Sequence, residues 1–173
     1  MKKTLIVLLL LVGITANAQQ KHLGLKAGVN FASLTGDWAD DLDNKTGYHI
    51  GVTAELGWKD SFSIQPEVIY STQGAELEDI DFKIDYLNVP VLAKIYMVKK
   101  NLSFMAGPQF GYVINDNFDS DDLKEFDLSG AVGLELKLLS FYAQARYNFG
   151  FTDVTNVGGK NGVFQLSIGH NFL

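Results

Sequence analysis

The chain has no cysteine, which excludes disulfide bonds, cysteine metal sites and a lipid-modified cysteine. Prolines number only three, and the formal net charge of −6 argues against a basic surface for nucleic acid or anionic lipid. Long apolar runs are scarce as well. Beyond the N-terminal region the longest uncharged segment, 101–115, is interrupted by Gly107, Pro108 and Gly111, which excludes a membrane-spanning helix there.

The N-terminal region has the organisation of an export signal. Two lysines precede the apolar run 5–12, and Ala16 and Ala18 then provide the small residues of an A-x-A cleavage site. The run is shorter than the roughly 20 residues that a membrane-spanning helix needs. We therefore predict that a signal peptide, 1–18, is removed after export and that residues 19–173 fold as one domain.

Alternation with a period of two is the main pattern in the rest of the chain. In the first segment every second residue is apolar, whereas Lys26 and Asn30 lie on the opposite face. Each such segment has about ten residues, the length that a tilted strand needs to cross a bilayer. The pattern occurs eight times, at 23–31, 48–58, 62–71, 87–97, 102–112, 127–138, 141–149 and 164–169.

Long and short connections alternate between these segments, as in an up-and-down barrel with external loops and periplasmic turns. The fold prediction is all-β, an eight-stranded antiparallel up-and-down transmembrane β-barrel with both termini at the periplasmic side. Because proline removes a hydrogen-bond donor from the ladder, we expect Pro66, Pro90 and Pro108 at bulges or at a rim. The long connections are expected at 33–47, 72–85, 115–126 and 151–162, and the short ones at 59–60, 99–100 and 139–140.

Four stretches, 24–31, 65–67, 86–94 and 146–153, together with the strand pattern, resemble the eight-stranded outer-membrane β-barrel family of the Bacteroidota type, often labelled porin-family. The resemblance implies a bacterial outer membrane, contact with outer-membrane lipid, and insertion by the barrel assembly machinery. It implies no reaction. The chain departs from the family at its end, because such barrels commonly finish on an aromatic residue whereas here Phe172 is followed by Leu173.

Six charged residues fall on the inward faces, about five to seven positions from the periplasmic end of each strand. We predict that they meet in one layer and neutralise one another, because buried charges persist only when paired and an eight-stranded lumen is narrow enough for side chains to fill. The alternatives are an ion or proton path, or paired carboxylates that act as acid and base. This predicted lumen network consists of Lys26, Glu55, Glu67, Lys94, Glu135 and Arg146.

Catalytic motifs are not found in the sequence: it contains no G-x-S-x-G, no H-E-x-x-H and no phosphate-binding loop. His49 is the one inward histidine near acids, and we interpret it as a structural residue with satisfied hydrogen bonds rather than as a general base. We assign no catalytic, cofactor-binding or metal-ligating residue, and the chain is predicted not to be an enzyme.

Acidic side chains dominate the first three long connections. Their carboxylates would suit calcium, but no segment has the EF-hand spacing. We predict a non-enzymatic surface, scaffold or interaction protein that displays these loops to an extracellular partner; the alternatives are a small-solute porin, a lipid-modifying enzyme and a soluble periplasmic ligand-binding barrel, which the alternation disfavours. The acidic residues are Asp37, Asp40, Asp41, Asp43, Glu76, Glu78, Asp79, Asp81, Asp116, Asp119, Asp121, Asp122 and Glu125.

Overall fold

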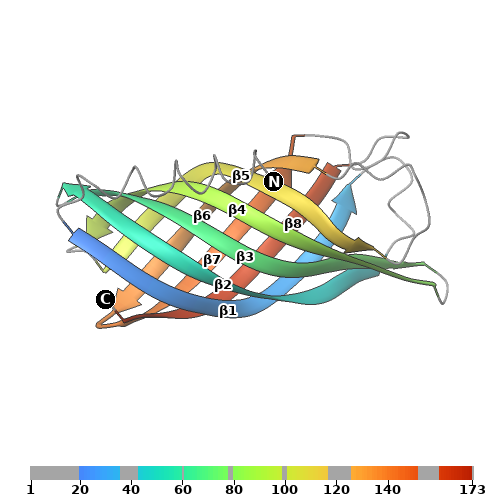
Figure 1. The fold of residues 1–173 in the computed structure, drawn as a ribbon, viewed down its shortest axis with the longest axis horizontal. Coiled ribbons are helices and arrows are strands. Elements are labelled where there is room, and N and C mark those ends of the chain that lie inside the picture. Colours follow the sequence, from blue (N-terminus) through green and yellow to red (C-terminus); the bar gives the residue numbers. More distant parts are fainter. Residues whose placement is uncertain are drawn as a thin grey trace.

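The computed structural model describes residues 20–35, 43–59, 61–77, 80–98, 101–116, 126–151 and 160–172. Each strand pairs antiparallel with the next, and β8 pairs with β1, so the sheet closes into a barrel (Figure 1). The predicted all-β up-and-down barrel is confirmed. In these ranges no helix is long and apolar enough to cross a membrane. The strands are β1 (Gln20–Thr35), β2 (Asp43–Lys59), β3 (Phe62–Leu77), β4 (Ile80–Val98), β5 (Leu102–Asp116), β6 (Phe126–Leu138), β7 (Phe141–Gly150) and β8 (Lys160–Asn171).

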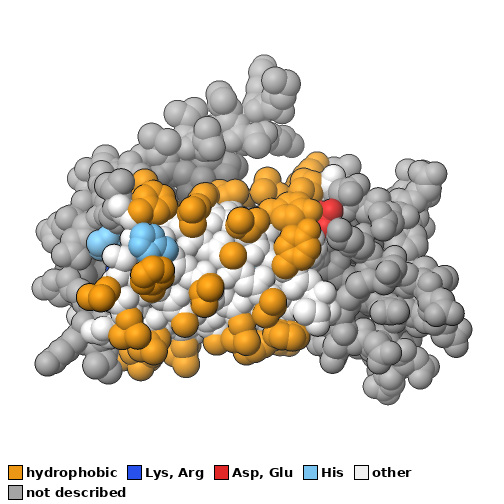
Figure 2. Space-filling model, turned by 90° about the horizontal axis from the view of Figure 1, so that it is seen from below, with side chains coloured by type: hydrophobic (Ala, Val, Ile, Leu, Met, Phe, Trp, Pro, Cys, Tyr) orange, Lys and Arg blue, Asp and Glu red, His pale blue; other side chains and the backbone are white. Residues whose placement is uncertain are grey.

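The two faces of the barrel differ as the alternation predicts. Apolar side chains point outward and stay exposed, Leu25 by 53% and Ile168 by 73% of their surface, whereas the polar residues between them are buried in the lumen. Figure 2 shows hydrophobic side chains across the described surface on one side of the barrel. A soluble ligand-binding barrel would need the reverse distribution.

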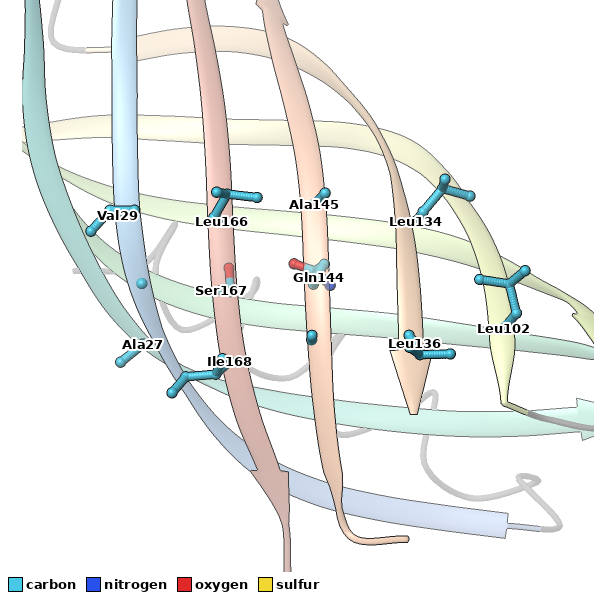
Figure 3. Close-up of a pocket in the computed structure, with 12 residues that line it drawn as sticks. Ala27, Val29, Leu102, Leu134, Leu136, Gln144, Ala145, Leu166, Ser167 and Ile168 are labelled. Atoms are coloured by element: carbon cyan, nitrogen blue, oxygen red, sulfur yellow. The ribbon is translucent and has the colours of Figure 1, made fainter. Parts of the chain in front are cut away.

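An apolar groove of about 450 Å³ crosses the outer surface at β7 (Figure 3). It forms because β7 presents the small side chains of Ala143 and Ala145, while leucines of β6 and Leu166 and Ile168 of β8 stand on either side. Small residues next to large ones leave a hollow in a surface that is otherwise evenly covered. The groove keeps the apolar chemistry of the whole outward face.

One predicted loop is wrong. Residues 72–85 are not a long connection, since β3 continues to Leu77, β4 begins at Ile80, and Gly74 pairs with Lys83 between them. The alternation Ile80, Phe82, Ile84 supports a strand there, although its acidic neighbours suggested a loop. The strands accordingly run from 10 residues in β7 to 19 in β4.

The prolines also differ from the expectation, because none lies at a register shift or at a rim. Opposite Pro66 the ladder between β2 and β3 is interrupted and then resumes in the same register. The β3–β4 ladder is interrupted in the same way at Pro90, and the β4–β5 ladder at Pro108. Each proline therefore removes local pairing on one side only, and the neighbouring pairs hold the register.

The short turns lie at one end of the barrel, the end that the sequence predicts to face the periplasm. The predicted turn at 139–140 is confirmed between β6 and β7, and Leu139 there has a positive φ of 59°. Asn171 of β8 pairs with Gly24 of β1, so the end of the last strand lies beside the first. Phe172 is 54% exposed and continues the outward series of β8.

Candidate functional site

The structure brings all six predicted lumen residues together in the periplasmic half of the barrel. They come from six different strands, and each is at most 6% exposed. Their carboxylates and cations are paired directly, so that no predicted member lies apart from the network. The six residues divide into two clusters rather than forming one set of direct contacts, and Glu67 makes no ion pair with Lys94.

The first cluster is centred on the carboxylate of Glu67. Its Oε2 atom accepts hydrogen bonds from Lys26 Nζ and from Arg146 Nη2, both at 2.9 Å. The three side chains are fully shielded from solvent. Two cations around one carboxylate give this cluster a formal charge of +1.

The second cluster is centred on the ammonium group of Lys94. It donates to Glu135 Oε1 at 2.7 Å and to Glu55 Oε2 at 3.2 Å. The other oxygen of Glu55 accepts hydrogen bonds from Ser63 at 3.1 Å and from the Tyr96 hydroxyl. Two carboxylates around one cation give a formal charge of −1, which is opposite to that of the first cluster.

Two glutamines that are not among the six predicted residues, Gln65 and Gln144, join the clusters. Gln65 donates to Glu67 Oε1 at 2.7 Å and accepts from Lys94 at 2.8 Å. Gln144 accepts from Lys26 at 2.9 Å and donates to Glu135 at 3.4 Å. Each amide therefore accepts from a lysine and donates to a glutamate, and the joined network is neutral, the condition under which buried charges are tolerated.

His49 lies in a separate layer on the extracellular side of the network. Asn30 Nδ2 donates to the carbonyls of Tyr48 and Thr72, which orients its Oδ1 towards His49 Nδ1 at 2.7 Å. Nδ1 must then carry the proton, so in the neutral ring Nε2 accepts from the Ser167 hydroxyl at 2.8 Å. Both ring nitrogens are satisfied, as expected for a structural histidine.

A serine, a histidine and an amide in this order have the connectivity of a nucleophile, its base and the group that orients the base. Ser167 and His49 are nevertheless 5% and 1% exposed. The Ser167 hydroxyl is turned into the barrel in Figure 3, away from the apolar groove on the outer surface. Ser167 contributes to the lining of that groove, but its hydroxyl is bonded to His49 on the lumen side.

Gly28 explains how the ring fits. A Cβ at this position would lie 2.7 Å from His49 Cε1 and 1.9 Å from the carbonyl oxygen of Leu166, both closer than van der Waals contact. Glycine is therefore required by the close approach of the β8 backbone and of the imidazole. Within the described ranges no group of three histidine, aspartate or glutamate side chains has the arrangement of a metal site.

A closed eight-stranded antiparallel barrel with an apolar outer face and a polar interior is an outer-membrane β-barrel, since in the bilayer every strand must be paired and every lipid-facing side chain apolar. The family model described as "Outer membrane protein beta-barrel domain" matches residues 17–156. The chain belongs to this family, and its place is the bacterial outer membrane.

Solved structures show the same fold at low sequence identity. Neisserial surface protein A is 13% identical with a TM-score of 0.63, and the match covers 89% of this chain and all of that one. Ail, the attachment invasion locus protein of Yersinia pestis, is 16% identical with a TM-score of 0.60 and the same coverage. OprG from Pseudomonas aeruginosa is 12% identical with a TM-score of 0.52 and covers 90% of this chain and 98% of that one. No curated protein matches the sequence.

Proposed function

We propose that the protein is a non-enzymatic outer-membrane barrel with a lumen closed to ions, whose acidic external loops contact an extracellular partner. The observation that carries the proposal is the buried charge network. Its six charged residues come from β1, β2, β3, β4, β6 and β7, so the paired side chains connect most of the circumference across the lumen. An ion that crossed would have to displace pairs that are shielded from water.

Strand β5, which carries no member of the charge network, also helps to fill the lumen. Gln144 Nε2 lies 3.2 Å from the sulfur of Met105 on β5, and Met105 packs with Leu92 and Ala131 in an apolar cluster within the lumen. At this level of the lumen every charge is paired and the neighbouring side chains are apolar. A permeant solute would therefore find neither an unpaired charge nor a hydrated path. This favours a filled barrel over a small-solute porin.

Planar-bilayer recording of the refolded protein tests the proposal. We expect the wild type to show no steady unitary conductance, and we expect Lys94→Ser to show conducting events, because it leaves Glu55 and Glu135 without their shared cation. Leu134→Ser, which faces lipid at the surface groove, is the matched control and should remain closed. Reproducible single channels in the wild type would replace this proposal with the small-solute porin.

The partner is proposed from charge. A partner of basic character fits the acidic residues of the long connections, which the sequence concentrates there. The names of two proteins of the same fold, a surface protein and an attachment invasion protein, support a role at the cell surface. Outer-membrane lipid and the barrel assembly machinery are proposed as further contacts, whereas nucleic acid is not.

Surface pull-down from cells tests the loop proposal. We expect the wild type to capture a protein at low salt and to release it at high salt. A triple variant, Asp119→Asn, Asp121→Asn and Asp122→Asn, should not capture this protein. Lys124→Gln, the control, removes a positive charge from the same connection, and this variant should still capture the protein. Equal capture by the triple variant and the wild type would contradict a role for these carboxylates.

The Ser167–His49–Asn30 arrangement gives the lipid-modifying enzyme a specific test. A small serine-reactive fluorophosphonate should leave the folded barrel unlabelled, because the hydroxyl is buried and bonded to His49 on the lumen side. Labelling that disappears in Ser167→Ala but persists in the matched variant Ser129→Ala would show an activated nucleophile. That result would replace the non-enzymatic proposal.

A further inference from the structure

Hydrogen bonding divides the lumen into two parts. The two lysines, the three glutamates and the two linking glutamines of the charge network have no buried side-chain atom without a partner. Nine buried side-chain atoms elsewhere in the described ranges do lack one. Apart from the Ser103 atom, these atoms lie at the level of Arg146 or closer to the extracellular end of the barrel. They belong to Asp85, Asn88, Ser103, Gln109, Arg146, Asn148 and Gln165.

Three of these residues line the same small cavity. The side chains of Asn88, Gln109 and Asn148 are 3%, 4% and 3% exposed, and all three border a cavity of about 10 Å³ in the extracellular half of the barrel. Tyr86 and Ser129 add hydroxyl groups to its wall. This is about the room that a single water needs, and a buried water requires two to four polar partners, which the cavity supplies.

Arg146 also has unpartnered atoms, and it belongs to the charge network as well. It is the one arginine in the sequence, and it is 1% exposed. Only Nη2 is engaged, by Glu67, whereas Nε and Nη1 have no partner. Gln165 lies directly opposite in the register of β7 and β8, and its Oε1 also lacks a partner.

The chemistry of the unpartnered atoms identifies the ligand. Four are donors, on Asn88, Asn148 and twice on Arg146, and four are acceptors, on Asp85, Gln109, Asn148 and Gln165. A cation would leave the donors unpaired, and an anion would leave the acceptors unpaired. Water both donates and accepts, so it alone matches the whole set.

We propose that the extracellular half of the lumen is a dead-end water site: one ordered water in the cavity bridges Asn88, Gln109 and Asn148, and further water outside that cavity satisfies the free N–H groups of Arg146. The charge network below is dry and forms the floor. The barrier to ions is consequently the network with its adjoining apolar cluster rather than the full height of the barrel.

Solution NMR of the refolded, ¹⁵N-labelled protein in lipid nanodiscs tests the proposal. The sole arginine gives a single Nε–H signal, and side-chain amide signals are assigned by single substitutions. We expect cross-peaks to the water resonance, of opposite sign in NOESY and ROESY spectra, at Arg146, Gln109 and Asn148. The amides of Gln65 and Gln144, which are fully partnered, are the internal controls and should show none.

Hydroxyl protons could relay magnetisation from solvent and imitate a bound water. The double variant Tyr86→Phe with Ser129→Ala removes the hydroxyls of the cavity, and the cross-peaks at Gln109 and Asn148 should persist in it. Their loss in this variant would overturn the proposal, as would the absence of water cross-peaks in the wild type. Equal cross-peaks at Gln65 and Gln144 would contradict the dry floor.

Discussion

The same strands form both halves of the lumen, but the buried polar side chains have different hydrogen-bond partners in the two halves. Near the periplasm, lysines and glutamates are paired within 3.2 Å and joined by two glutamines. Towards the long connections, amides face a small cavity with free donors and acceptors. The comparison indicates that buried position alone does not set the role of a polar side chain here. In our proposals a side chain blocks the lumen when it is paired across it, and it holds water when it is not.

The difference has an energetic consequence. Removing one member of a buried charge pair leaves the other charge uncompensated, which costs far more than removing an amide that water satisfies. The same substitution should therefore have unequal effects in the two halves. The following changes test that inequality.

The largest effect is expected for Glu67→Leu. It leaves Lys26 and Arg146 close together without their shared carboxylate, and we expect a loss of about 3–5 kcal/mol in the free energy of unfolding, as for other broken buried pairs. Urea unfolding of the protein in lipid vesicles measures it. Ile69→Leu, a buried apolar change two residues along the same strand, is the control and should cost less than about 1.5 kcal/mol. A loss of similar size in both variants would contradict the role of charge.

A second test compares the lipid-facing and lumen-facing sides of β8. Leu166→Arg places a charge in the hydrocarbon region and should cost about 2–4 kcal/mol, whereas Ser167→Arg points into the polar lumen and should cost less. Folded yield in bilayers and urea midpoints compare the two. A greater loss at Ser167 would show that the lumen at this level is too tightly packed to accept the charge.

The third test asks whether Lys94 and Glu135 act as a pair. Lys94→Met and Glu135→Leu should each destabilise the barrel. The double variant should lose less than the sum of the two by about 0.5–3 kcal/mol, because Glu135 is no longer left without Lys94, although Glu55 loses its cation in both Lys94 variants. Unfolding free energies of the four proteins complete the cycle. Additive losses would mean that the 2.7 Å contact contributes no coupling.

The alternation of residues made much of this architecture predictable from the sequence. A period of two identifies both the strand and the face, so all eight strands and the inward positions of Lys26 and Arg146 followed from it. Partner choice did not follow. It depends on stagger between strands, which the sequence left open, and the structure joins Glu67 and Lys94 only through Gln65.

Other misses have local causes. The acidic residues of 72–85 favoured a loop although the alternation of Ile80, Phe82 and Ile84 continued through it. We expected bulges at the prolines because proline cannot donate a hydrogen bond to the ladder. The residue pairs on both sides of each interruption nevertheless keep the strands in register. The predicted signal peptide, 1–18, lies outside the residues that the structure describes and stays a prediction, as does the Bacteroidota type.

The smallest expected effect gives the closest comparison, because it uses one strand and one kind of side chain. Gln144 and Asn148 both lie on β7, both are 3% exposed, and both carry an amide. Gln144→Leu removes the partner of Lys26 and of Glu135, and we expect a loss of about 1–3 kcal/mol. Asn148→Leu removes an amide that has no protein partner and displaces its water, so the change should stay below about 1 kcal/mol. Urea unfolding in vesicles at one lipid composition measures both. Equal losses, or a larger loss at Asn148, would mean that the two halves of the lumen do not differ in the way that their hydrogen bonds indicate.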